Sequence, residues 1–262
     1  MKLLRFLPLV LALSCIDLMT EKTHYNSLYF NGGSWIEIEQ IDNMKLGSND
    51  FTLQFWVSGG EVDTNEAPAL FSLIGPSDNV TLALLRDSNN QNSITTIINS
   101  NISKHEISEL DWSNSDNFYL ISFLFSNNED VKMYINSTSE DLNGHINLAG
   151  EKLIISALAN KEQTILENFW YGYIDEIRLW NTLLADSTIN FQSEHPDKLG
   201  ENYRYTINGE KINTYLDSLV GIWRLIFEAP HSIIKDDSGY NNDGTIYTLT
   251  GYSVKLSNKG IQ

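Results

Sequence analysis

The stretch WYGYIDEIRLWN (170–181) places two acids and an arginine, Asp175, Glu176 and Arg178, inside what reads as a β-strand. Such charges can serve as a catalytic acid–base pair, as metal ligands or as structural ion pairs. Because successive side chains of a strand point to opposite faces, alternation predicts that Asp175 and Glu176 face opposite ways. Two carboxylates that flank one glycosidic bond must reach the same sugar, so this pair is not expected to be catalytic.

The same alternation puts Asp175 on one face with Tyr171, Tyr173, Ile177 and Leu179. A buried carboxylate must be paired, hydrogen-bonded or bound to a metal. We therefore predict that Asp175 is a structural carboxylate held by hydrogen bonds across the fold. A role linked to calcium is the alternative.

A second acidic pair lies in WIEIEQ (35–40), where Glu37 and Glu39 share a face. The pair bears a superficial similarity to the Glu-x-Asp-x-x-Glu signature of family 16 glucanases. The middle aspartate is absent, however, and the second acid follows two residues after the first instead of four. A strand with a solvated acidic face explains the pattern more simply, and no catalytic residue is predicted.

The loop DDSGYNNDG (236–244) gathers oxygen-bearing side chains, among them Asp236, Asn241 and Asp243. Calcium prefers hard oxygen ligands, and glycines let a short loop close around an ion. The spacing differs from an EF-hand and lacks its closing glutamate. We predict a structural Ca²⁺ site here; a turn held by its own Asn and Asp side chains, without metal, is the alternative.

Two aromatic residues, Trp56 and Tyr134, lie at positions that alternate with apolar ones in FTLQFWV (51–57) and VKMYI (131–135). Aromatic ring faces stack well on pyranose rings, so these two side chains are candidates for a sugar-binding platform. The alternative is that a second sheet or a loop covers them.

Several other chemistries are excluded by what the chain contains. None of the five histidines stands four residues from another, so no histidine metal motif is indicated. Neither a Gly-x-Ser-x-Gly elbow nor a phosphate-binding glycine loop is present. The formal net charge of -17 repels nucleic acid, and no basic run offsets it.

Period-two alternation with polar turns dominates the chain after residue 27, which predicts many short strands. We expect strands at 34–39, 51–57, 80–85, 94–98, 118–125, 131–135 and 152–157. Helical pattern is scarce; the best candidate follows Asn181, with Asp186 as its cap. Residues 195–217 read as a long irregular excursion with a small hairpin turning at residues 208–209, and the β pattern resumes at Leu219.

The N-terminus carries Lys2 and Arg5 and then an apolar run that is too short to span a bilayer, which predicts an export signal over residues 1–14. Cys15, the only cysteine in the chain, follows it, so no intramolecular disulfide can form. This arrangement resembles a bacterial lipobox, although Ala12 stands where leucine is usual. The resemblance implies lipidation at Cys15 and a tether over residues 15–26; cleavage without lipidation, giving a secreted protein, is the alternative.

Four segments resemble a laminin-G-like, concanavalin A-like jelly roll of the bacterial type. They are SLYFNGGSWIEIE (27–39), FTLQFWVS (51–58), FWYGYIDEIRLWNTLLADSTI (169–189) and LVGIWRLIFEAPHSIIKDDSGYNNDGTI (219–246). The resemblance implies an all-β, two-sheet antiparallel sandwich over residues 27–262 with one short helix. Calcium is common in such jelly rolls, which extends the calcium expectation to Asp236 and Asp243. The family's Glu-Gly-x-Gly turn is missing, because Ala229 and Pro230 follow Glu228.

The resemblance also implies a function. We expect a non-catalytic lipoprotein on the bacterial outer membrane or cell surface that binds carbohydrate or a surface protein through loops at an edge of the sandwich. A glycoside hydrolase or polysaccharide lyase on the same fold is one alternative, and a purely structural envelope protein is another. The expected membrane contact is the lipid anchor alone, and no cofactor other than Ca²⁺ is expected.

Overall fold

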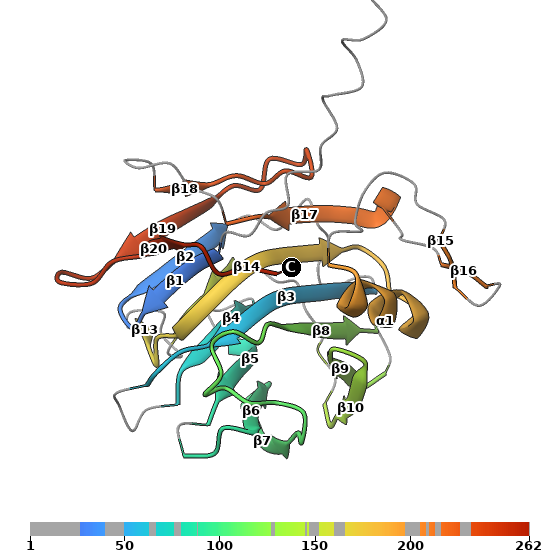
Figure 1. The fold of residues 1–262 in the computed structure, drawn as a ribbon, viewed down its shortest axis with the longest axis horizontal. Helices are drawn as coiled ribbons and strands as arrows, with labels where there is room; N and C mark the ends of the chain where they lie inside the picture. The colour runs from blue at the N-terminus through green and yellow to red at the C-terminus, as the bar shows by residue number, and fades with distance from the viewer. Residues whose placement is uncertain are drawn as a thin grey trace, which may run out of the picture.

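Alternating apolar residues assemble into two eight-stranded antiparallel sheets that pack face to face in the computed structural model (Figure 1). The structure describes residues 27–39, 50–62, 67–75, 80–87, 89–126, 129–144, 146, 152–159, 166–196, 205–207, 210–212, 216–225 and 232–261. The predicted signal (1–14), Cys15, the tether (15–26) and the Glu228 turn lie outside the described residues. Within them, no helix is long and apolar enough to cross a membrane.

The first sheet has the order β10-β9-β8-β3-β14-β1-β20, and β17 also pairs with β14. Its strands are β1 (Ser27–Asn31), β3 (Phe51–Gly59), β8 (Tyr119–Phe125), β9 (Val131–Ile135), β10 (Thr138–Leu142), β14 (Tyr171–Trp180), β17 (Leu219–Trp223) and β20 (Lys255–Ser257). On its side away from β3, the long strand β14 pairs first with β1 and then, over its last residues, with β17.

The second sheet has the order β18-β19-β2-β11-β4-β5-β6-β7. Its strands are β2 (Ser34–Glu39), β4 (Ala69–Ile74), β5 (Val80–Arg86), β6 (Ser93–Ile98), β7 (Asn101–Glu106), β11 (Lys152–Ile155), β18 (Ile233–Ile234) and β19 (Gly244–Thr248). Two small antiparallel pairs complete the strands, β12 (Leu158–Ala159) with β13 (Leu166–Glu167) and β15 (Tyr205–Ile207) with β16 (Glu210–Ile212). The helices are α1 (Asp186–Glu194) and the 3₁₀ turn η3 (Leu216–Ser218). The predicted two-sheet antiparallel jelly roll with one short helix is confirmed.

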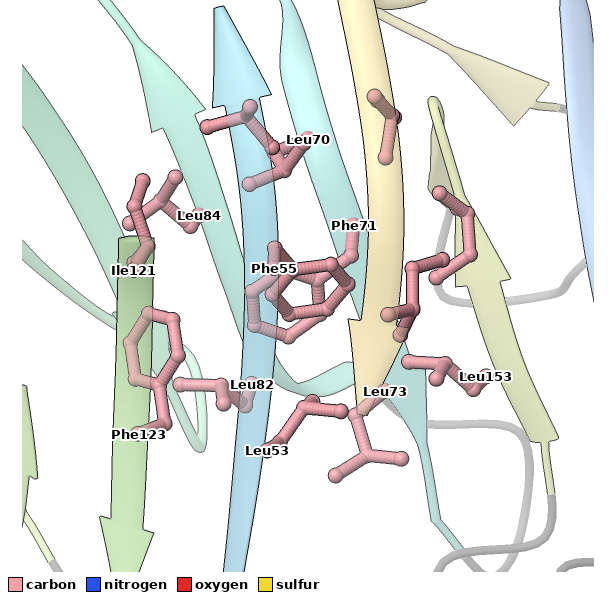
Figure 2. Close-up of a cluster of buried hydrophobic side chains, with 14 of the residues drawn as sticks. Leu53, Phe55, Leu70, Phe71, Leu73, Leu82, Leu84, Ile121, Phe123 and Leu153 are labelled. Carbon is pink, nitrogen blue, oxygen red and sulfur yellow. The ribbon is translucent and has the colours of Figure 1, made fainter. Parts of the chain in front are cut away.

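The main core fills the space between the two sheets. On β3, Phe51, Leu53, Phe55 and Val57 all point into it, as alternation predicts. The ring of Phe55 stacks on Phe71 of the opposite sheet, with centroids 4.7 Å apart (Figure 2). Each such ring removes a large apolar surface from water, which is the main favourable contribution to folding.

Part of the other face of the first sheet is also buried, where α1 packs against Tyr134 and Trp180 (Figure 1). Gln54 of β3 donates from Nε2 to Gln192 Oε1 of α1 at 2.9 Å and to Ser122 Oγ at 3.1 Å. Its Oε1 accepts the indole N–H of Trp180 at 3.0 Å. The polar side chains of Gln54, Ser122 and Gln192 are therefore buried and bonded to one another instead of solvated.

Two local predictions can be compared with the structure. The helix after Asn181 is present, but Ala185 occupies its N-cap position, and Asp186 is the first helical residue. The carboxylate of Asp186 instead accepts the hydroxyl of Tyr134 at 2.6 Å. Strands β15 and β16 pair antiparallel on either side of residues 208–209, as the predicted hairpin requires.

Candidate functional site

A β-bulge in β14 changes the faces that alternation predicts for the side chains of residues 170–181. Ile174 and Ile177 oppose residues of β3 that are only two apart, so one extra residue lies between them. Both isoleucines point into the main core. Asp175 and Glu176 are therefore both displaced from the core face, and the prediction that they face opposite ways is wrong.

Asp175 is 1% exposed and lies under the C-terminal segment. Its Oδ2 accepts the backbone N–H of Ile261 at 2.9 Å. Burial raises the pKa of Asp175 to about 8, and the nearby Glu176 acts in the same direction, whereas the Ile261 N–H and Arg178 oppose it. This environment is that of a carboxylate enclosed by structure, without an opening toward a substrate.

The carboxylate of Glu176 is also bound by protein partners. Its carboxylate accepts from Arg178, which is fully buried, and lies 3.5 Å from Arg224. Arg178 also donates to the carbonyl oxygen of Pro196 at 3.1 Å, at the end of the segment that follows α1. Asp175, Glu176 and Arg178 therefore connect β14 to the C-terminal segment and to the residues after α1. Their role is structural.

In the predicted calcium loop, Asp236 is a hydrogen-bond acceptor for four N–H groups. Oδ1 accepts the backbone N–H of Ile222 at 3.0 Å and of Ser238 at 2.9 Å. Oδ2 accepts the backbone N–H of Asn242 at 3.0 Å and its side-chain amide at 3.3 Å. Asp236 is only 8% exposed, so these bonds tie the loop to β17 in a nearly dry environment.

The other two predicted ligands are arranged in the same way. Asp243 accepts the backbone N–H of Asp236 at 3.0 Å and forms an ion pair with Lys235. Although burial opposes it, these partners lower the pKa of Asp243. Asn241 has a φ of 61° and donates to the carbonyl of Gly239 at 3.5 Å, so it shapes the turn. The carboxylates of Asp236 and Asp243 thus have protein partners, which favours the alternative of a turn held by its own Asn and Asp side chains over the predicted Ca²⁺ site. Across the described part of the chain, no group of three or more His, Cys, Asp or Glu side chains could hold a metal.

Chelation is therefore expected to leave the protein unchanged. Thermal unfolding of the full chain should give the same midpoint, within about 1 °C, in about 5 mM EDTA and in about 5 mM CaCl₂. The reason is that the chelator removes no ligand bound to the folded state. A midpoint that rises with calcium concentration would show that the loop rearranges to bind the ion.

Trp56 and Tyr134 are both buried, at 3% and 2% exposure. Tyr134 packs with Trp180 and with Ile189 of α1 in the cluster beneath the helix. Neither ring offers a face to solvent, so the sugar platform expected at these two positions is absent. Helix α1 covers Tyr134 on this side of the sheet, and strand alternation alone carries no information on such a cover.

An aromatic row that the sequence reasoning missed lies on the outer face of the second sheet. Trp35 of β2 stacks on Tyr247 of β19, its direct cross-strand partner, with ring centroids 5.4 Å apart and planes 17° apart. Phe169 lies on the ring of Trp35 at 5.9 Å. Tyr247, at the end of the row, is 41% exposed, and the other two rings are partly exposed. We call Trp35, Phe169 and Tyr247 the aromatic row.

A polar row runs beside it, one step along the same strands. Ile36 and Ile38 point into the core, so Glu37 and Glu39 share the outer face with Trp35. Glu37 Oε1 accepts the indole N–H of Trp35 at 2.8 Å, and Glu37 Oε2 lies 3.1 Å from Lys152 Nζ of β11. The ammonium of Lys152 is also 3.3 Å from Glu39.

Thr245 of β19 is the cross-strand partner of Glu37 and completes this set. We call Glu37, Glu39, Lys152 and Thr245 the polar row. Aromatic rings flanked by carboxylate, ammonium and hydroxyl groups can bind a molecule that has both apolar faces and many hydroxyls. The only sequence signal was the shared face of Glu37 and Glu39, because Tyr247 and Phe169 join it solely through long-range pairing.

These features define an antiparallel jelly roll with an amphipathic outer face. The chain belongs to the concanavalin A-like lectin/glucanases superfamily, whose family model matches residues 30–190, more than half of the chain. The predicted resemblance to this family is thereby confirmed. No curated protein matches the chain.

Solved structures show the same fold at low identity. The chain is similar to a heptameric SAP-like pentraxin from Limulus polyphemus, with 13% identity and a TM-score of 0.50, over 87% of this chain and 96% of that one. It is also similar to a putative carbohydrate binding protein from Bacteroides ovatus, with 13% identity and a TM-score of 0.52, over 88% of this chain and 59% of that one. At such identity the likeness concerns the fold alone.

Proposed function

We propose that this protein is a non-catalytic carbohydrate-binding protein, and that its glycan lies on the aromatic row. The observation that carries the proposal is the pairing of Tyr247 and Trp35, two stacked and partly exposed rings, with hydrogen-bonding side chains directly beside them. Membership of a superfamily that includes lectins, and the likeness of the fold to a putative carbohydrate binding protein, support it.

The chemistry of the two rows matches that of a sugar. A pyranose ring has a C–H face that packs on an aromatic ring and an edge of hydroxyls that need hydrogen-bond partners. The outer face of the second sheet offers Tyr247 and Trp35 for the first, and Glu39, Lys152 and Thr245 for the second. Large aromatic patches on a protein surface commonly mark a binding site.

Catalysis is not part of the proposal. Hydrolysis of a glycosidic bond needs one carboxyl group that donates a proton and a second that acts as base or nucleophile. Both oxygens of Glu37 are already engaged, by the Trp35 indole and by Lys152, and Glu39 lies against the same ammonium. In the proposal Glu39 and Lys152 position a sugar without cleaving it, and Glu37 holds the ring of Trp35.

Removing the ring of Trp35 is expected to abolish most of the binding. In the Trp35→Ala variant the stack loses its middle ring, and the dissociation constant for a bound oligosaccharide should rise by about tenfold or more, the usual effect of an aromatic anchor at a binding site. Tyr247→Ala should act in the same direction and is the safer variant, because this ring is well exposed and contributes little to folding. Isothermal titration calorimetry with a ligand selected on a glycan array measures the change.

Tyr240→Ala is the matched control, because Tyr240 is 47% exposed but lies in the loop before β19, outside the aromatic row. It should bind as the wild type does. If Trp35→Ala, Tyr247→Ala and Tyr240→Ala all bind the glycan equally and melt at the wild-type temperature, the glycan does not bind at the aromatic row. A glycan array without any bound ligand would contradict the proposed function itself.

The proposal places the domain outside the cell. The N-terminal segment predicted to direct export, followed by Cys15 as the predicted site of lipidation, would hold the jelly roll at a bacterial surface, where polysaccharide is abundant. Binding in that setting needs no enzymatic activity, only a stable face presented to solvent.

A further inference from the structure

We propose that the aromatic row selects neutral glycans and rejects acidic ones, and that Glu37 is the residue that sets this preference. The inference rests on the proposed function, since it concerns the ligand of the same face. It is carried by the arrangement of Glu37, Glu39 and Lys152 along the polar row.

The charges that border the aromatic row are unbalanced. Among the described residues of β2 and β11, two carboxylates share one ammonium, that of Lys152, so one negative charge is left over. The adjoining pair at the start of β19, Lys235 with Asp243, is neutral in sum. The field at the aromatic row is therefore negative, in agreement with the chain's net charge of -17.

Lys152 is not free to receive an acidic ligand. Its ammonium lies 3.1 Å from Glu37 and 3.3 Å from Glu39, and its side chain is only 25% exposed. A uronate or sialate that approached this ammonium would have to displace a carboxylate that is fixed on the same sheet. The lysine thus holds the two acids in place, and its charge is already neutralised.

Glu37 is held more firmly than Glu39. Its side chain is 17% exposed, against 63% for Glu39, and its second oxygen accepts the indole N–H of Trp35 at 2.8 Å. A fixed carboxylate next to a half-buried ring interacts with a bound charge at a lower effective dielectric than water provides. An acidic sugar stacked on the row would lie within a few ångströms of this group, and the repulsion would weaken its binding by about tenfold or more.

The same contact makes Glu37 a positioning residue for Trp35. The hydrogen bond to the indole N–H fixes the rotation of the ring on the sheet, which keeps it parallel to Tyr247. Glutamine can accept the same N–H through its Oε1 without carrying charge. The Glu37→Gln variant therefore separates the charge of Glu37 from its role in holding the ring.

The test compares neutral and acidic ligands that share a sugar backbone. Oligogalacturonides and their fully methyl-esterified forms share one sugar backbone, and lactose and sialyllactose differ by a single acidic residue. The wild type is expected to bind the neutral member of each pair at least about tenfold more tightly at low salt, with the gap narrowing at 0.5 M NaCl because salt screens exposed charges. In Glu37→Gln the gap should close mainly through tighter binding of the acidic member, while the affinity for the neutral member stays within about twofold.

Glu129→Gln is the matched control, because it removes the same charge from an exposed position before β9 of the other sheet. It should leave the preference as it is in the wild type. Equal or tighter binding of the acidic member by the wild type would overturn the inference and leave the proposed function standing. Loss of neutral binding in Glu37→Gln would show that the carboxylate itself contacts the sugar, which also overturns a role by repulsion. If no glycan of an array binds, neutral or acidic, the proposed function fails, and the inference fails with it.

Discussion

Replacing Asp236 with alanine is expected to lower the free energy of unfolding by about 3–5 kcal/mol, because hydrogen bonds to a charged group contribute about 1.5–3 kcal/mol each and do not add fully. The change removes the acceptor of four N–H donors, from Ile222, Ser238 and Asn242. Since the site is almost dry, water cannot readily replace the carboxylate, and the donors are left unsatisfied. Urea unfolding followed by tryptophan fluorescence measures the loss.

Asp237→Ala is the matched control at the neighbouring position. Asp237 is exposed and its carboxylate pairs only loosely with Arg224, at 3.4 Å. An exposed ion pair of this kind contributes less than about 1 kcal/mol, so the control should unfold close to the wild type. Asp236→Asn should lie between the two, because its amide group can accept through one oxygen only. Similar losses for the Asp236 and Asp237 variants would contradict the assignment of Asp236 as the anchor of this loop.

Replacing Asp175 with asparagine is expected to stabilise the protein at alkaline pH and to change it little in acid. Burial raises the pKa of Asp175 in the folded state to about 8, far above the ordinary value of 3.8. Between these two values the folded state binds more protons than the unfolded state, so the contribution of Asp175 to stability is complete below pH 3.8 and is lost as the pH rises toward 8. At pH 8.5 the wild type bears the cost of a buried charge, on the order of 5 kcal/mol at 1.36 kcal/mol per pH unit, and asparagine does not.

The measurement is the difference in unfolding free energy between Asp175→Asn and the wild type, from urea titrations at several pH values between 4.5 and 8.5. Using the difference removes the pH dependence of the other acids. Asparagine keeps an oxygen that can accept the Ile261 N–H, so the C-terminal segment should stay in place. Asp116→Asn is the control, because Asp116 is exposed and contacts Lys259 of the same segment. Its unfolding free energy should show the same pH dependence as that of the wild type. A pH-independent difference for Asp175→Asn would contradict a raised pKa.

The strands that could be predicted are those with one clear apolar face. β3 and β9 alternate cleanly, and their apolar residues lie in the main core as expected. β4 was not predicted, because its sequence ALFSLI is buried on both sides and shows no alternation. β7, with the sequence NISKHE, was missed for the opposite reason: it is an edge strand that is largely exposed on both sides and is held by backbone pairing to β6.

The sheet faces on which the side chains of residues 170–181 lie could not be predicted from the sequence. One inserted residue in β14 shifts every following side chain to the other face, and nothing in the letters IDEIR marks the position of a bulge. The burial of Trp56 and Tyr134 was equally hidden. For Tyr134 it depends on where α1 lies in space, whereas a strand pattern reports only that two faces alternate.

The sequence by itself determined a sandwich of many short strands, a short helix and an acidic chain, because alternation, turn residues and charge are local properties. The two-sheet jelly roll was implied by the resemblance of four segments to its family. Only the tertiary structure decided which side chains are within reach of one another. Trp35, Phe169 and Tyr247 come from three distant segments, and they form one row because β2 pairs with β19 and because the chain before β14 returns over the same sheet. Asp236 likewise anchors its loop because folding brings the N–H of Ile222 in β17 to its carboxylate. Such contacts are set by the pairing of strands that are distant in sequence. The energy of each contact depends on the whole packed arrangement and not only on the residues next to it in sequence.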